Sequence, residues 1–138
     1  MKRRENNGKI PIKIEQLAVG YEFPPSIFEL EPVVVSKYLE AVGVKNSKAP
    51  EVVPPMAIAA YTMGVVAEAM ALPAGTIHAS QEVEFFKVVP VGATIDCRGR
   101  VAQNINRGQL NLLSIELEAL DQDQEKVLSG RATLVISS

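Results

Sequence analysis

Hydrophobic and polar residues alternate with a period of two through the C-terminal part of the chain. In three successive segments every second position is apolar or small, and the positions between them are mostly charged or hydroxylated. This pattern predicts long strands in an antiparallel sheet that is covered on one face only. The positions on the predicted buried face are Ile95, Cys97, Gly99 and Val101; Leu113, Ile115, Leu117 and Ala119; and Leu128, Gly130, Ala132, Leu134 and Ile136.

Residues typical of turns separate these segments, so we expect the last strands to form a meander. The turns are predicted at Pro90-Val91-Gly92, Asn106-Arg107-Gly108 and Asp121–Gln124. Nearer the N-terminus, Ser26–Leu30 is a candidate short strand. Pro32 suits the first turn of a helix that runs to about Val42.

The segment Met56–Ala71 has a different pattern, because it is rich in alanine and apolar almost all round. Its length and its alanines favour a helix, and the helix is too short to span a membrane. We therefore expect protein to bury it on most sides. A buried helix followed by long one-sided strands predicts an α+β domain in which a curled antiparallel sheet wraps around a central helix. That architecture is the hot-dog fold, and its open sheet edges predict a homodimer or a heteromer.

Composition narrows the class of protein further. The chain has 138 residues, and we expect a disordered leader over residues 1–8 and one domain over residues 9–138. A net charge of −2 gives no electrostatic reason to expect nucleic acid as a partner. We expect no membrane span, and a single cysteine fits a reducing, cytoplasmic location.

Several segments in this order resemble the hydratases and dehydratases of the MaoC-like family, and the resemblance covers nearly the whole chain after residue 10. Such proteins add water to, or remove it from, acyl thioesters of coenzyme A or acyl carrier protein. The resemblance implies that the thioester is a substrate and that no separate cofactor is needed. The segments that carry it are Ile14–Gly20, Val35–Gly43, Leu72–Gly75, Gln81–Phe85 and Pro90–Ile95.

The residues on which the family's chemistry depends are missing. The family places an Asp directly after the glycine that ends its first helix and a His five residues later; here those positions hold Val44 and Ala49. Only Asn46 of that loop pattern is present. A His-Gly pair opens the family's central helix and supplies an amide donor, but this chain has Pro54 and Pro55, and proline has no N–H.

Other residues are candidates for the missing roles. His78 is the only histidine, and its titration near neutrality suits proton transfer, although an isolated histidine in a strand is more often structural. Glu68 is the only acid in the apolar helix, where some hot-dog thioesterases carry a base or nucleophile; it could equally reach solvent. Tyr61 and Thr62 could bind substrate or tie the helix to the sheet. Cys97 is expected in the core, and no metal site is expected.

Three functions remain open on this basis. The chain could be a MaoC-like subunit that shapes an acyl-thioester tunnel while a second hot-dog subunit supplies the Asp and His, as the resemblance to heteromeric relatives implies. It could be a thioesterase or hydratase with relocated residues, Glu68 or His78. It could also be a non-catalytic domain for ligand binding or assembly.

Overall fold

The computed structural model of the chain describes residues 17–45 and 50–137. The predicted leader and the site candidates Asn46 and Ala49 lie outside these residues. The elements are β1 (Ser26–Glu29), α1 (Pro32–Ala41), α2 (Pro55–Ala69), β2 (Ile77–Phe85), β3 (Thr94–Arg107), β4 (Leu110–Leu120) and β5 (Lys126–Ser137).

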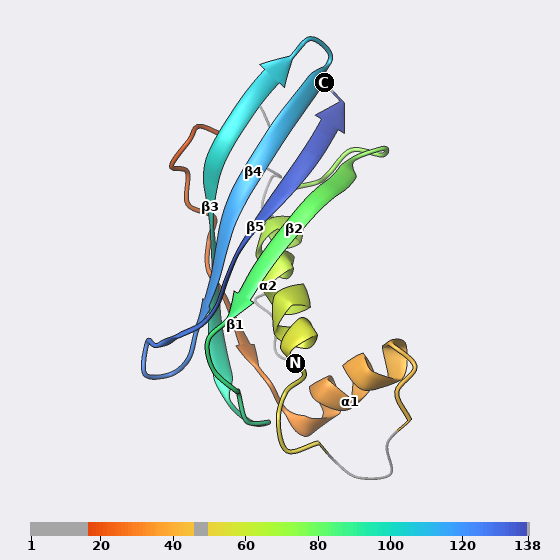
Figure 1. Cartoon of the computed structure of the whole chain (residues 1–138), viewed down its shortest axis with the longest axis vertical. Coiled ribbons are helices and arrows are strands. Elements are labelled where there is room, and N and C mark those ends of the chain that lie inside the picture. The colour runs from red at the N-terminus through yellow and green to blue at the C-terminus, as the bar shows by residue number, and fades with distance from the viewer. Residues whose placement is uncertain (1–16, 46–49, 138) are drawn as a thin grey trace.

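The five strands form one antiparallel sheet in the order β1-β3-β4-β5-β2. Strands β3, β4 and β5 are consecutive neighbours, which confirms the predicted meander. Strand β2 lies beside β5 and forms one edge of the sheet, while β1 forms the other. Figure 1 shows α2 along one face of the strongly curved sheet and α1 beyond one end of it. The hot-dog architecture predicted from the residue pattern is confirmed.

The buried face of the sheet carries the alternating residues that the sequence predicted. Ile95, Cys97, Leu113, Ile115 and Ala132 have no exposed surface. This inner face packs against α2, which contacts β3, β4 and β1. Burying each large aliphatic side chain contributes about 1.5–3 kcal/mol, so the period-two pattern is also the main source of stability.

Strand β2 approaches β5 closely at Gly130, which pairs with Val83. A Cβ atom at Gly130 would collide with the backbone carbonyl oxygen of Glu82. Glycine is therefore required here by the neighbouring backbone and not by a special dihedral angle. It lets the backbone of β2 lie close against β5 at this point.

Helix α2 spans Pro55–Ala69, close to the predicted Met56–Ala71, but this chain buries it on one side only. Thr62, Val65 and Val66 are buried against the sheet. Met56, Ala60 and Ala67 are exposed and form a stripe on the opposite side. Their spacing of four and seven residues puts them on one helical face. The all-round apolar pattern thus includes a face that nothing in the described part of this chain covers.

Helix α1 confirms the prediction to within a residue. Pro32 lies in its first turn, and Val34 and Val35 are its buried residues. Gly43 follows with a φ of 82°, a left-handed conformation that glycine adopts without strain.

Candidate functional site

A small polar group lies where α2 meets β1 and β3. The Thr62 hydroxyl is fully buried; it donates a hydrogen bond to the Ile58 carbonyl oxygen at 2.7 Å and lies 3.5 Å from the Cys97 sulfur. Burial raises the pKa of the Cys97 thiol to about 12. The thiol is therefore protonated at neutral pH, as expected for a core cysteine. Thr62, a candidate for substrate binding, has its hydroxyl engaged within the chain.

Glu68, one of the two catalytic candidates, belongs to the same region. The buried Ser26 hydroxyl donates a hydrogen bond to Glu68 Oε2 at 3.0 Å. This bond joins the last turns of α2 to β1, across 42 residues of sequence. The Glu68 side chain is partly buried and does not simply extend into solvent. The sequence had left both possibilities open.

Tyr61 is the candidate that is best placed to donate a hydrogen bond. Its ring is half-buried and stacks on Phe28, with ring centroids 5.6 Å apart. Burial and the neighbouring Tyr38 raise the pKa of the Tyr61 phenol above its ordinary value. The phenol is thus a neutral O–H donor over the physiological pH range.

His78, the other catalytic candidate, lies near the start of β2. It pairs with Leu134, an inner-face residue of β5, so its side chain belongs to the inner side of the sheet. Its ring is exposed, and His78 Nε2 lies 2.9 Å from Gln81 Oε1. His78 and Glu68 therefore belong to separate hydrogen-bonded pairs, one on β2 and one between α2 and β1.

The start of α2 offers less to a substrate than the family pattern would. Pro54 is the N-cap residue and Pro55 is the first helical residue, and no side chain caps this end of the helix. Pro55 has no N–H, so its backbone cannot donate a hydrogen bond to a ligand at this point. Val44 is exposed after the end of α1, and it has no ionisable group.

A charged groove of about 870 Å³ crosses the outer face of the sheet, the face turned away from α2. The pattern of residues along the chain did not predict this groove. Glu116 is central to it and bonds to Arg100 and Arg131 at 2.5 and 3.2 Å. The hydrogen bond from Arg100 in particular lowers the pKa of Glu116. The alternation of charges along single strands was visible in the sequence, but their alignment across strands depends on register.

Within the described residues, no three His, Cys, Asp or Glu side chains are grouped so that they could hold a metal ion. Over the same residues, no helix is long and apolar enough to cross a membrane.

Residues 8–129 match a protein family described as FAS1-like, dehydratase domain region. This chain belongs to that family. The match includes both helices and strands β1 to β4, and ends within the first four residues of β5. No curated protein matches the chain at a significant level.

Solved structures with the same fold include MaoC-like dehydratases and hydratases. The R-hydratase PhaJ1 from Pseudomonas aeruginosa has a TM-score of 0.77 and 15% identity, covering 93% of this chain and 87% of its own. The MaoC-like dehydratase from Rhodospirillum rubrum has a TM-score of 0.71 and 18% identity, with coverages of 89% and 94%. The truncated HadBC (3R-hydroxyacyl-ACP dehydratase) complex from Mycobacterium tuberculosis has a TM-score of 0.69 and 16% identity, with coverages of 91% and 99%. The chain thus shares the hot-dog fold of these dehydratases and hydratases.

Proposed function

We propose that this chain is a subunit of an acyl-thioester hydratase or dehydratase that binds and shapes the acyl-CoA or acyl-ACP pocket without supplying the acid–base pair. A second hot-dog subunit carries the Asp and His and completes the site. The observation that carries the proposal is the proline pair at the start of α2, together with Val44 after α1. Hydration of an enoyl thioester needs a base for water, an acid for the α-carbon and donors for the carbonyl oxygen.

The uncovered side of α2 supports the second part of the proposal. Met56 is 55% exposed and is followed by Ala60 and Ala67 on the same helical face. Phe85 on the inner side of β2 is 37% exposed. A hot-dog subunit that docked against β2 and α2 would bury these apolar side chains. One structural neighbour, HadBC, is itself a complex.

Tyr61 and the polar group around Glu68 give this chain a part in binding. The neutral Tyr61 phenol can donate to a thioester carbonyl or to the acyl carrier. Ala60 and Ala67 are small and lie on the exposed face of α2, against which an acyl chain would lie in this proposal. These side chains position and enclose a substrate, while proton transfer is left to the second subunit.

The proposal is tested by comparing the chain alone with its complex. The complex is purified from the native source through a tag on this chain, and both samples are assayed with 2-enoyl-CoA by loss of the enoyl absorbance. We expect turnover from the complex and none from the chain alone. Tyr61→Phe should raise the KM of the complex, whereas Tyr21→Phe, elsewhere in the fold, should not. The proposal would be refuted if no second hot-dog chain co-purified with this chain and the purified protein did not bind acyl-CoA.

A specific observation favours one other function. Ser26 orients the carboxylate of Glu68 on α2, the helix on which some hot-dog thioesterases carry their base or nucleophile. Thiol release by the isolated chain would identify this activity if Glu68→Gln abolished it. Glu40→Gln, at an exposed position of α1, is the matched control. A hydratase activity of the isolated chain that His78→Ala abolished would point to relocated acid–base chemistry instead.

The remaining alternative is a binding or assembly domain with no thioester ligand. Thermal-shift measurements distinguish it, because a ligand that binds only the folded state raises the melting temperature. A shift with another metabolite and none with coenzyme A or acyl-CoA would support that alternative.

A further inference from the structure

Two rows of charged side chains cross the outer face of the sheet toward the free edge at β2. In the first row, Arg100 on β3, Glu116 on β4, Arg131 on β5 and Glu82 on β2 lie opposite one another in register. The charges therefore alternate from strand to strand. Glu116 forms ion pairs with both of its neighbours in this row. The row ends at the edge with the carboxylate of Glu82, opposite Arg131.

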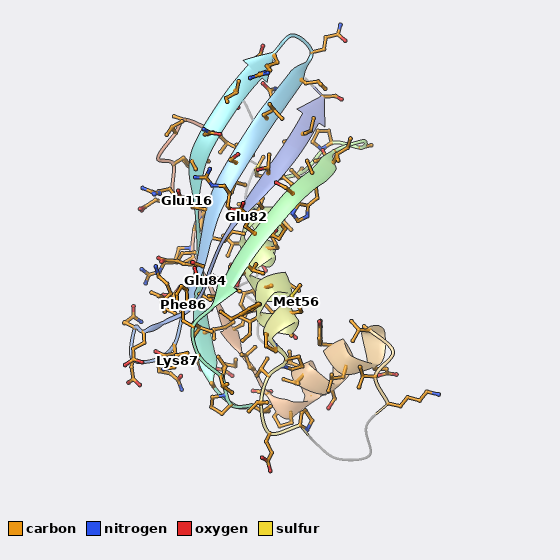
Figure 2. All side chains as sticks on the ribbon, viewed as in Figure 1. Met56, Glu82, Glu84, Phe86, Lys87 and Glu116 are labelled. Carbon is orange, nitrogen blue, oxygen red and sulfur yellow. The ribbon has the colours of Figure 1, made fainter. Side chains whose placement is uncertain are left out.

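The second row lies two residues further along the strands. Arg98, Glu118, Ser129 and Glu84 are aligned from β3 to β2. This row also ends in a glutamate, and its only basic member is three strands away. No described residue forms an ion pair with Glu82 or Glu84, and both side chains are exposed (Figure 2). The free edge of the sheet thus presents two carboxylates on one face.

The same strand has an open backbone edge. β2 is nine residues long, pairs with β5 alone among the described strands, and is exposed along most of its length. Unpaired N–H and C=O groups in such a strand can bind the edge strand of another chain. Phe85 on its inner side adds exposed apolar surface at this edge, and Met56 on α2 is exposed as well. In the view of Figure 2, Met56 projects from α2 beyond the β2 edge of the sheet.

A second copy of this chain fits the edge poorly. A bulge between His78 and Ser80 breaks the alternation of β2, so that only Ser80–Phe85 is regular. If two β2 strands paired antiparallel over this regular part with their inner and outer faces matched, the registers with the most matched pairs would be centred on Glu82 or on Val83. The first places Glu82 opposite Glu82 of the second copy. The second places each Glu82 opposite Glu84 of the second copy. Like charges directly opposite each other destabilise a strand pair.

We propose that β2 docks the edge strand of a different hot-dog chain, one that carries lysine or arginine at two alternate, outward-facing positions. Such a strand continues the alternation of charge from Arg100 to Glu82 across the subunit boundary. It also places an opposite charge beside Glu84, whose own row has its basic residue, Arg98, three strands away. This inference rests on the proposed function, because it specifies the second subunit. It adds that charge at β2 selects a heteromer over a homodimer.

The test uses a charge-swapped version of this chain as the probe. Wild type, the Glu82→Lys/Glu84→Lys variant and their equimolar mixture are compared by sedimentation at low salt. Each alone repels its own copy at β2, whereas the mixture brings opposite charges together. We expect the mixture to associate about tenfold more tightly than either protein alone. We expect 1 M salt to remove most of that difference, because the Debye length falls to about 3 Å.

A neutralised variant tests the repulsion separately. Glu82→Gln/Glu84→Gln should self-associate more tightly than wild type. Glu29→Gln/Glu40→Gln changes the net charge equally on β1 and α1 and should not. Hydrogen exchange of the β2 amides locates the contact, and circular dichroism confirms that each variant is folded. Wild type alone gives a further test. Salt screens the repulsion between the glutamates, so its self-association should strengthen as the salt concentration is raised.

The result that overturns the inference is a tight wild-type homodimer that protects β2 amides and responds neither to salt nor to these substitutions. Protection of another surface in the mixture would overturn it as well. These outcomes are independent of the proposed function, which fails if acyl-CoA neither binds the complex nor is turned over by it. A β2 homodimer that bound acyl-CoA would therefore contradict the inference that charge at β2 selects a heteromer, but it would not contradict acyl-CoA binding by this chain.

Discussion

Gly130→Ala tests whether the close approach of β2 to β5 requires a residue without a side chain at this position. The added Cβ would meet the carbonyl oxygen of Glu82, a backbone atom that cannot rotate away. Strand β2 would have to move outward. Gly99→Ala is the matched control, since Gly99 lies on the same inner face and its added Cβ would meet only side-chain atoms. The nearest of them is Leu117 Cδ2, at 3.3 Å.

The expected cost follows from this difference in neighbours. Forcing extra volume into a packed strand pair costs about 1–3 kcal/mol. Replacing glycine also reduces the conformational entropy of the unfolded chain, which stabilises the folded state by about 0.4–1 kcal/mol. That contribution applies equally to both variants, so it cancels when they are compared. We expect Gly130→Ala to be less stable than Gly99→Ala by about 1–3 kcal/mol, which corresponds to roughly 3–5 °C of melting temperature per kcal/mol.

Urea unfolding followed by circular dichroism measures both variants at one protein concentration, because association would otherwise change the apparent stability. Hydrogen exchange should show faster opening of β2 in Gly130→Ala than in Gly99→Ala. The reasoning is refuted if Gly130→Ala is as stable as Gly99→Ala, or if the lost stability leaves the exchange of β2 unchanged.

Two further predictions concern titrating groups. Burial raises the pKa of Cys97 to about 12, so the thiol ionises at a lower pH in the unfolded chain than in the folded protein. The free energy of unfolding should therefore fall from about pH 9 toward pH 12, by up to about 1.4 kcal/mol per pH unit. Cys97→Ala should reduce this fall, while the part that comes from the raised pKa of Tyr61 remains. Equal slopes of unfolding free energy against pH for wild type and Cys97→Ala, measured by urea titration, would contradict the prediction. Asp121 accepts hydrogen bonds from Lys87 Nζ and from the N–H groups of Asp123 and Glu125, and the Lys87 bond is the largest influence that lowers its pKa below 3.8. Its contribution to stability is present above that value and lost as the pH falls through the lowered pKa. Asp121→Ala should therefore lower the urea midpoint at pH 7 more than Asp121→Asn, which retains an acceptor; the reverse order would refute this role.

The proposal that a second subunit supplies the acid–base pair rests on residues that are read directly from the sequence. Val44, Pro54 and Pro55 are known from the sequence alone, and no tertiary contact can give a proline an N–H. The candidates for replacement roles were located on the correct elements, with His78 on β2 and Glu68 on α2. The partners of these side chains were not predictable, because the hydrogen bond between Ser26 and Glu68 joins residues far apart in sequence.

What the sequence determined about the fold was its set of elements and the face that each one buries. A period of two or an apolar alanine-rich segment reports burial directly, since burial is what selects those residues. Only the tertiary structure decided that β2 lies beside β5, that α2 keeps one face open, and that Glu82 aligns with Arg131 and Glu116. Strand order and register depend on contacts between distant segments, and a shift along a strand changes which charges face each other without changing the local pattern.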